Sequence, residues 1–279
     1  LTRSYFSLPP VLLFKGFNNG IKKVHDLYDP NSPDPVANLS DAFIKGFETL
    51  PLAGNLGFLS KIAKYIPRPN WHITWDGLQD LLFFKKIADN ISLDHSYSST
   101  YTEGWTITPD GQKQIQTQRV EYGFMPLIGL NFTFAKLWNG SLVASIKYST
   151  KTSYDLGIST RSIIESFSKD IGITAGYSKS GFEIPFFGFS LKNDIQFNLS
   201  YTKSIASSTN FSMIDFTEAG IPQNGTTRTI VGPSIKYTIS SKVQLSIFYT
   251  RTTVTPEGAN PVPPSVQNLA GLDVHITIQ

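Results

Sequence analysis

The sequence predicts an all-β fold, an antiparallel transmembrane β-barrel wall that is part of a larger barrel, preceded by a short irregular and helical segment. A long alternation of side chains, its repetition along the chain and a low charge content support this prediction. Residues 120–134 carry an apolar side chain at every even position, from Val120 through Phe124 to Phe134. A period of two excludes a helix, and the run is long for a strand of a soluble domain.

The composition agrees with a sheet that has one apolar and one polar face. Charged residues make up 16% of the chain, below the roughly 25% of ordinary soluble domains, and aromatic residues reach 13%. Hydrophobic residues make up 40%, but the longest apolar run, at 8–17, is broken by prolines, Lys15 and Gly16. No membrane-spanning helix is therefore predicted, and the balance is typical of an outer-membrane barrel wall.

Charge and cysteine content exclude several classes of function. The net charge is +3 and there is no run of basic residues, so we expect no nucleic-acid partner. The absence of cysteine removes disulfides, thiolate metal sites and thiol nucleophiles together. The chain begins at Leu1 without an initiator Met or a signal sequence, which we interpret as removal of a signal or as a piece of a longer polypeptide.

Residues 1–69 differ in pattern from the remainder. The prolines within 29–35 predict a turn-rich connector, and Ser40 with Asp41 predicts a capped helix start leading into 42–47. A second short helix is predicted over 56–65, ending before Pro67. Short apolar helices need a surface to pack on, so we expect this segment to be a plug, a lumen-lining segment or a periplasmic collar.

Residues 70–279 predict about nine antiparallel transmembrane strands. They include residues 71–75, 91–102, 115–135, 142–149, 171–177, 195–201, 231–237, 243–249 and 272–278. Asp110–Gly111 and Asn139–Gly140 are predicted to be turns. The apolar phase runs unbroken through Pro126, which we therefore expect at a bulge or an unpaired edge within one long strand.

The connections alternate in length. Those at 136–140 and 240–242 are short and 181–192 is intermediate, whereas longer ones are predicted at 155–167, 207–226 and 255–267. Outer-membrane barrels have short periplasmic turns and longer external loops. If the C-terminus lies in the periplasm, each long loop falls outside and each short turn inside.

The alternation assigns residues to the lipid and to its borders. Eight side chains of the apolar phase are predicted to face lipid, namely Ile146, Phe197, Leu199, Ile235, Leu245, Ile247, Val274 and Ile276. Aromatic side chains near the strand ends are predicted at the membrane interfaces, where amphipathic rings settle. These are Trp105, Tyr148, Tyr201 and Tyr249 toward the outer side and Trp138, Tyr177 and Tyr237 toward the inner side.

No catalytic or cofactor signature accompanies these strands, and we expect no enzyme activity, no metal and no cofactor. The four histidines are far apart in sequence, without the spacing of a metal site. Single-chain barrels usually have an even number of strands, and lipid does not tolerate an open edge. We therefore expect the remaining wall to come from an upstream part of the same barrel.

Several segments resemble the SprA/Sov family of giant outer-membrane translocons of type IX secretion. The segments that carry the resemblance are 67–78 (PRPNWHITWDGL), 93–101 (LDHSYSSTY), 126–129 (PLIG), 185–187 (PFF) with 191–195 (LKNDI), and 268–276 (NLAGLDVHI). Together they extend over most of residues 67–279. Because members of that family are far longer, the chain would correspond to the C-terminal part of one.

The resemblance implies a conduit that passes secreted cargo proteins across the bacterial outer membrane. It also implies partner proteins that plug the pore or gate it laterally, in contact with the lipid bilayer, and no catalysis. Two alternatives follow from the residues alone. One is a stand-alone outer-membrane porin or receptor-type barrel for small solutes, and the other is a soluble adhesin-like β-sandwich.

Overall fold

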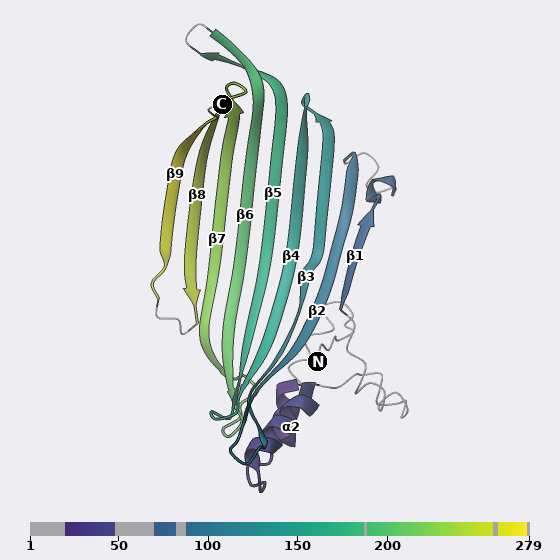
Figure 1. The fold of residues 1–279 in the computed structure, drawn as a ribbon, viewed down its shortest axis with the longest axis vertical. Coiled ribbons are helices and arrows are strands. Elements are labelled where there is room, and N and C mark those ends of the chain that lie inside the picture. The colour runs from purple at the N-terminus through teal and green to yellow at the C-terminus, as the bar shows by residue number, and fades with distance from the viewer. Residues whose placement is uncertain (1–19, 48–69, 82–87, 187–188, 259–261, 278–279) are drawn as a thin grey trace.

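A computed structural model describes residues 20–47, 70–81, 88–186, 189–258 and 262–277. Nine strands form one antiparallel sheet in the order β1 to β9, so each strand pairs with its neighbours in sequence (Figure 1). Their bounds are β1 Trp71–Asp76, β2 Asn90–Ile107, β3 Lys113–Leu137, β4 Gly140–Gly157, β5 Ser162–Phe186, β6 Phe189–Ser212, β7 Ile221–Thr238, β8 Val243–Glu257 and β9 Ser265–Ile276. The predicted all-β antiparallel fold is confirmed.

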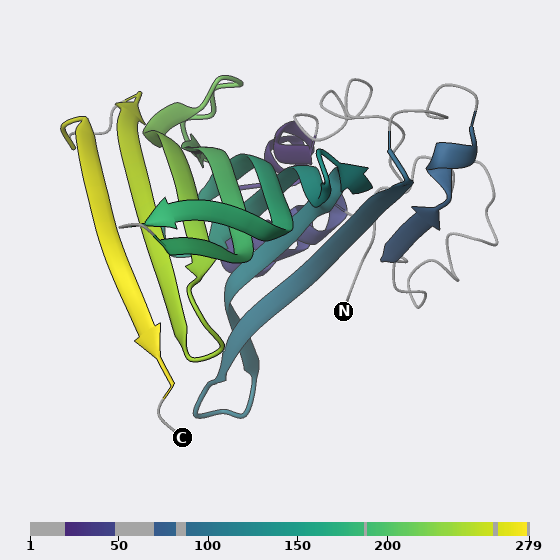
Figure 2. The same ribbon diagram turned by 90° about the horizontal axis from the view of Figure 1, so that it is seen from above.

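The sheet is open. Strands β1 and β9 lie at opposite margins of a curved sheet in two perpendicular views (Figures 1 and 2), and in the described part of the chain they do not pair with each other. Eleven of the twelve residues of β9 are exposed. These nine strands therefore form an arc and do not close into a barrel.

Strand β3 is one continuous strand of 25 residues, as the unbroken apolar phase predicted. Phe124 pairs with Thr150 of β4, and Ile128 pairs with Tyr148. Strand β3 therefore has two more residues than β4 over this stretch, and it bulges at Pro126. The bulge inserts an even number of residues. Because side chains alternate with a period of two, the apolar side chains stay on the same face on both sides of the bulge.

The strands extend further than the sequence indicated, so the long loops were predicted too long. The connections after β4, β6 and β8 comprise only residues 158–161, 213–220 and 258–264. At the opposite end, Trp138 and Asn139 both have positive φ and form the two-residue turn between β3 and β4, one position before the predicted Asn139–Gly140. Paired φ values of this kind give the type I′ turn that matches strand twist.

The two ends of the sheet differ in what they carry. The end that is uppermost in Figure 1 holds the C-terminus and the turns at 138–139 and 239–242, and we call it the upper end. The lower end holds the connections 108–112, 158–161 and 213–220 and helix α2, Pro35–Phe47. The predicted alternation of shorter and longer connections is retained, because after β2 the upper turns are shorter than most lower ones.

Helix α2 begins earlier than the sequence indicated. Asp34 caps it by accepting hydrogen bonds from the backbone N–H groups of Val36 and Ala37 at 3.1 and 3.0 Å, and Pro35 occupies the first helical position. Ser40, predicted at the helix start, is instead buried inside the helix. The predicted helix at 56–65 lies outside the described residues.

Helical residues 20–27 and α2 pack on the lower end of the sheet. Phe43 and Phe47 are buried against strand residues, and the Phe47 ring lies 4.7 Å from that of Tyr154. Lys22 bonds Glu218 of the 213–220 connection at 2.6 Å; this hydrogen bond raises the pKa of Lys22 and lowers the pKa of Glu218. The helices are thus held at the end of the sheet away from the C-terminus.

The sheet face under the helices is the one that carries the apolar alternation. Along β4, Tyr154 and Leu156 continue the phase of Ile146, and Leu156 pairs with Ile163 on β5. A plug or a lumen-lining segment would contact the other face, and a periplasmic collar would lie at the C-terminal end. The packing of α2 favours none of these three, and the role of residues 1–69 stays a prediction.

The contact between the two helices depends on Gly46. A Cβ at this position would overlap the side chain of Val24 and lie 3.0 Å from the carbonyl oxygen of Gly20. We expect Gly46→Val to destabilise the helical segment by about 1–3 kcal/mol through overpacking and to speed its cleavage in limited proteolysis. The matched Gly172→Val, where a Cβ meets nothing within 4 Å, should leave the cleavage rate unchanged. Equal cleavage in both variants would contradict this packing.

Candidate functional site

The distinguishing feature of the sheet is an exposed apolar belt across one face. Strand register places the belt side chains opposite one another, as in the row formed by Phe197, Ile235, Ile247 and Leu272. All of the predicted lipid-facing residues share this face, and all but Leu245 are exposed. The set is Ile146, Phe197, Leu199, Ile235, Leu245, Ile247, Val274 and Ile276.

The tyrosines of the belt lie on two parallel lines. Tyr148, Tyr201 and Tyr249 lie on every second strand, β4, β6 and β8. Traced through the pairing register, each of these tyrosines lies two residues closer to the upper end than the one before it. Tyr177 on β5 and Tyr237 on β7 are related by the same step. Two residues of ~3.3 Å over two strand spacings of ~4.8 Å give an inclination of roughly 35°. Transmembrane strands tilt by about 35–45°, so each line would run at one level around such a wall.

The width of the belt can be measured along a single strand. On this face of β5, Lys169 and Lys179 bracket the uncharged side chains Ile171, Ile173, Ala175 and Tyr177. Ten residues correspond to ~33 Å along the strand, and to roughly 25 Å along the axis at ~40° tilt. That height equals the apolar band of outer-membrane barrels, which is about 25 Å.

The remaining predicted interface aromatics lie at the strand ends. Trp138 stands at the upper two-residue turn and is 77% exposed, with its carbonyl oxygen accepting a hydrogen bond from the Tyr177 hydroxyl at 3.0 Å. Trp105 lies near the lower end of the β2–β3 hairpin, where the Lys113 ammonium is 4.3 Å from its ring centroid. Both tryptophans are exposed, and neither lines a described hollow.

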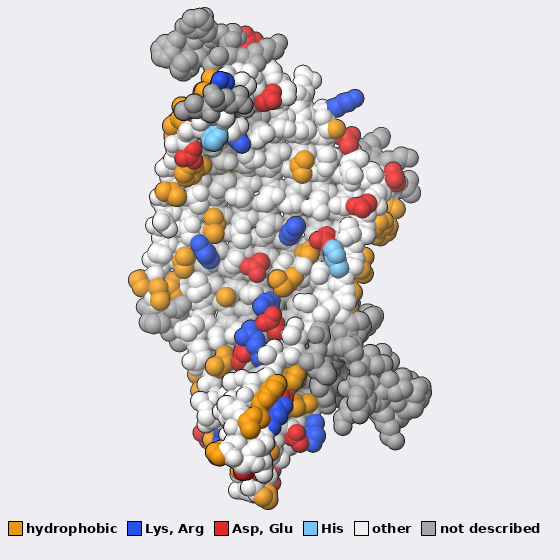
Figure 3. Space-filling model, in the orientation of Figure 1, with side chains coloured by type: hydrophobic (Ala, Val, Ile, Leu, Met, Phe, Trp, Pro, Cys, Tyr) orange, Lys and Arg blue, Asp and Glu red, His pale blue; other side chains and the backbone are white. Residues whose placement is uncertain are grey.

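The opposite face is covered by small polar side chains. Hydroxyl groups bond across strands, as between Ser145 and Thr174 and between Ser141 and Ser178, both at 2.7 Å. The broad face seen in Figure 3 is mostly neither charged nor hydrophobic, with scattered charges and with hydrophobic side chains that are scattered over it and more frequent at its margins and lower end. This pattern is expected of the face opposite the belt.

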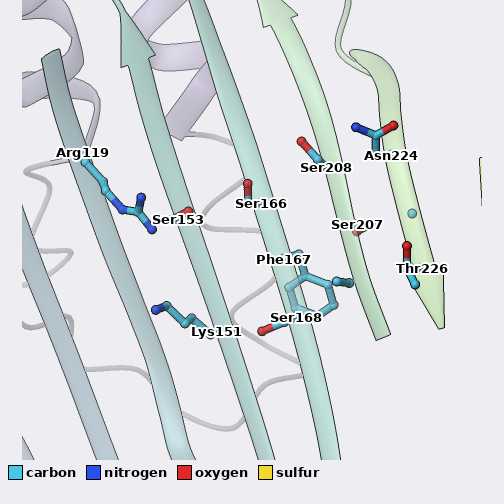
Figure 4. A pocket seen from close by; sticks show the side chains of 12 residues that line it. Arg119, Lys151, Ser153, Ser166, Phe167, Ser168, Ser207, Ser208, Asn224 and Thr226 are labelled. Carbon is cyan, nitrogen blue, oxygen red and sulfur yellow. The ribbon is translucent and has the colours of Figure 1, made fainter. Parts of the chain in front are cut away.

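A shallow hollow of about 330 Å³ opens between β3 and β7, toward the lower half of the sheet. Figure 4 shows Arg119 and Lys151 on one side of it and serine hydroxyls of the neighbouring strands around it. Glu121 bonds both cations at 2.8 Å, and Asp155 lies 3.3 Å from Arg119. The charges of the hollow are therefore mutually neutralised.

On the described part of the polar face, His72 lies beside a carboxylate and a hydroxyl, and its geometry does not fit a catalytic relay. His72 bonds Asp94, and the Thr74 hydroxyl lies 3.5 Å away, but both contacts are to Nε2. A hydroxyl–imidazole–carboxylate relay needs the two partners on different ring nitrogens. Among the residues that the structure describes, no three potential metal ligands cluster, and no helix there is long and apolar enough to cross a bilayer.

Sequence reasoning missed the cations on the apolar face. Lys203 and Arg251 follow Tyr201 and Tyr249 by two residues, so they continue the phase of the belt. Extending the alternation past each tyrosine would have found them. The inclination of the tyrosine lines could not be found this way, because it depends on the pairing register.

Comparison with protein-family models gives no match for this chain, and comparison with curated proteins gives none. The resemblance to the SprA/Sov family therefore rests on the motifs quoted above.

The face assignment can be tested with two adjacent residues. Ile247, 48% exposed, lies within the belt, whereas Ser246 lies on the polar face opposite Asp273. We expect Ile247→Arg to cost roughly 2–4 kcal/mol of stability in a membrane, because a charge would enter the apolar band, and Ser246→Arg to cost much less. Denaturant unfolding of the protein in lipid vesicles measures both. Equal costs would refute the assignment of faces.

Proposed function

We propose that this chain is a wall segment of an outer-membrane β-barrel that conducts secreted proteins, in the manner of type IX secretion. The observation that carries the membrane assignment is the belt, uncharged over ~25 Å of height and bordered by tyrosines on lines inclined at roughly 35°. In water such a face would expose a large contiguous apolar surface, which soluble monomers rarely do. In lipid the same exposure is favourable.

The open edges require further strands. In lipid, each backbone group of β1 and β9 without a partner would cost several kcal/mol, so we infer that other strands complete the wall. We propose that an upstream part of the same barrel supplies them, with the C-terminus on the periplasmic side. Nine strands that form only an arc are consistent with a barrel of many more strands.

The polar face suits a protein conduit better than a selective solute pore. Rings of like charge are one device by which pores select ions. Here Arg119 and Lys151 are neutralised by Glu121 and Asp155, and the rows around them are short hydroxyl side chains. Such a surface offers no strong binding site to a passing chain. Secreted cargo, and partners that plug or laterally gate the pore, are implied by the SprA/Sov resemblance.

Lipid contact is testable because the chain has no cysteine, so a single introduced cysteine carries a label that is unique within these 279 residues. We expect a fluorophore at Ile235→Cys, in the belt, to be quenched by lipids brominated on their acyl chains. The same label at the adjacent Ser234→Cys, on the polar face, should not be quenched. Equal quenching at both positions, or quenching at neither, would overturn the membrane assignment. The experiment uses the full-length protein reconstituted in vesicles.

Cargo passage separates the translocon from a porin. We expect a photo-crosslinking amino acid at Thr202, on the polar face, to capture secreted proteins in cells, and the same group at Tyr201, in the belt, to capture none. The physical reason is that only one face lines the path. Small-solute flux without any captured protein would favour the porin and contradict the translocon.

A further inference from the structure

Three basic side chains interrupt the apolar face along one border of the belt. Lys203 lies two residues below Tyr201, and Arg251 lies two residues below Tyr249. Lys169 pairs with Thr150, which lies two residues below Tyr148. We call Lys169, Lys203 and Arg251 the basic border.

The basic border runs at one level. Relative to the line of tyrosines, Lys203 on β6 and Arg251 on β8 are displaced by two residues toward the lower end, and Lys169 on β5 by about three. A tilt of roughly 35° therefore brings all three to a similar height, just outside the apolar band. Cations placed there meet lipid headgroups and not acyl chains.

These cations have no acidic partner among the described residues. None of the three takes part in an ion pair, and Lys169 instead lies with its ammonium 5.2 Å from the ring centroid of Phe167. On the strands that carry these cations, the acidic residues of this face below the belt are Glu165 and Glu257, which lie four and six positions closer to the lower end than Lys169 and Arg251. The polar-face cations Arg119 and Lys151, by contrast, are both paired with carboxylates.

Two of the cations are close neighbours. Lys169 pairs with Ile205 and Lys203 pairs with Ile171, so the two lysines are diagonal neighbours on adjacent strands. Diagonal neighbours are about 7–8 Å apart, a distance at which like charges repel unless an anion lies between them. A phosphate oxygen accepts hydrogen bonds from two ammonium groups at once.

We propose that the basic border binds the phosphate groups of anionic lipids in the leaflet at the lower end of the wall, with Lys169 and Lys203 sharing one phosphate. This inference rests on the proposed membrane location. It adds a lipid partner of defined charge, which the apolar belt alone does not require. Belt residues contact acyl chains of any lipid, whereas the basic border distinguishes headgroups.

A local reporter tests this in the full-length protein in vesicles of phosphatidylcholine with and without phosphatidylglycerol. The fluorophore is placed at Ile205→Cys, beside the lysines, and is quenched by lipids that carry a nitroxide on the headgroup. The ratio of quenching by phosphatidylglycerol to quenching by phosphatidylcholine measures the preference. We expect a clear preference for phosphatidylglycerol that weakens as salt rises.

The double variant Lys169→Gln/Lys203→Gln should lower this preference by about fivefold or more, since each basic side chain near an anionic surface contributes roughly that factor. The matched control Lys147→Gln/Lys236→Gln removes the same charge from the polar face and should retain the preference. Lys169→Arg/Lys203→Arg should also retain it. If the glutamine variant fails to fold, two other measurements still test the proposal. They are the salt dependence of the preference in the unsubstituted protein and the preference of the arginine variant.

The outcomes separate the two proposals. Equal quenching by both lipids, or equal loss in both double variants, would overturn the basic border while leaving the membrane location intact. Absence of quenching by either lipid, together with no quenching at Ile235→Cys, would overturn the membrane location itself.

Discussion

The structure depends on a shared phase of side-chain alternation across neighbouring strands. In a β-sheet, a slip of one residue moves every apolar side chain of a strand to the other face. Here the register keeps Ile146, Ile173 and Tyr201 in line on β4, β5 and β6, and it keeps the rest of the belt with them. The belt, the polar face and the open edges all follow from this agreement between alternation and pairing.

The β-bulges of the sheet are placed so that the apolar side chains of the belt stay on one face. Shifts of one residue occur between β5 and β6 near Phe182, between β3 and β4 near Leu137 and between β6 and β7 near Thr209, all beyond the belt. The bulge at Pro126 adjoins the belt and inserts two residues, so it changes the local pairing without exchanging the faces. Bulges of one residue can bend the ends because no continuous apolar surface depends on them there.

The apolar face is covered by protein at its lower end and is exposed higher up. At the lower end, Tyr154, Leu156 and Ile163 are buried by the helices and by Phe211 of β6. Higher up, Ile146, Leu199 and Ile235 have no protein cover among the described residues and are exposed. The covered part is stabilised like an ordinary core, by apolar area removed from water. The uncovered part has that advantage only in a lipid environment, and this contrast underlies the proposed location.

The sequence by itself determined the strand number, the two faces and the continuity of β3 through Pro126, because a period of two is a local property of the chain. It also placed Tyr148, Tyr201 and Tyr249 at similar distances from their turns. Strand ends were missed, since Ser- and Thr-rich segments such as 207–212 pair as strands only when a neighbour is present. The cap at Asp34 was missed because several residues nearby can cap a helix.

Only the tertiary structure decided the register, and with it the inclined lines of tyrosines, the diagonal pair of Lys169 and Lys203 and the neutralised charges around Arg119. It also showed that β1 and β9 do not pair and that α2 covers the lower end of the apolar face. These features join residues distant in sequence. Their positions depend on hydrogen-bond pairing between strands, which alternation within one strand does not specify.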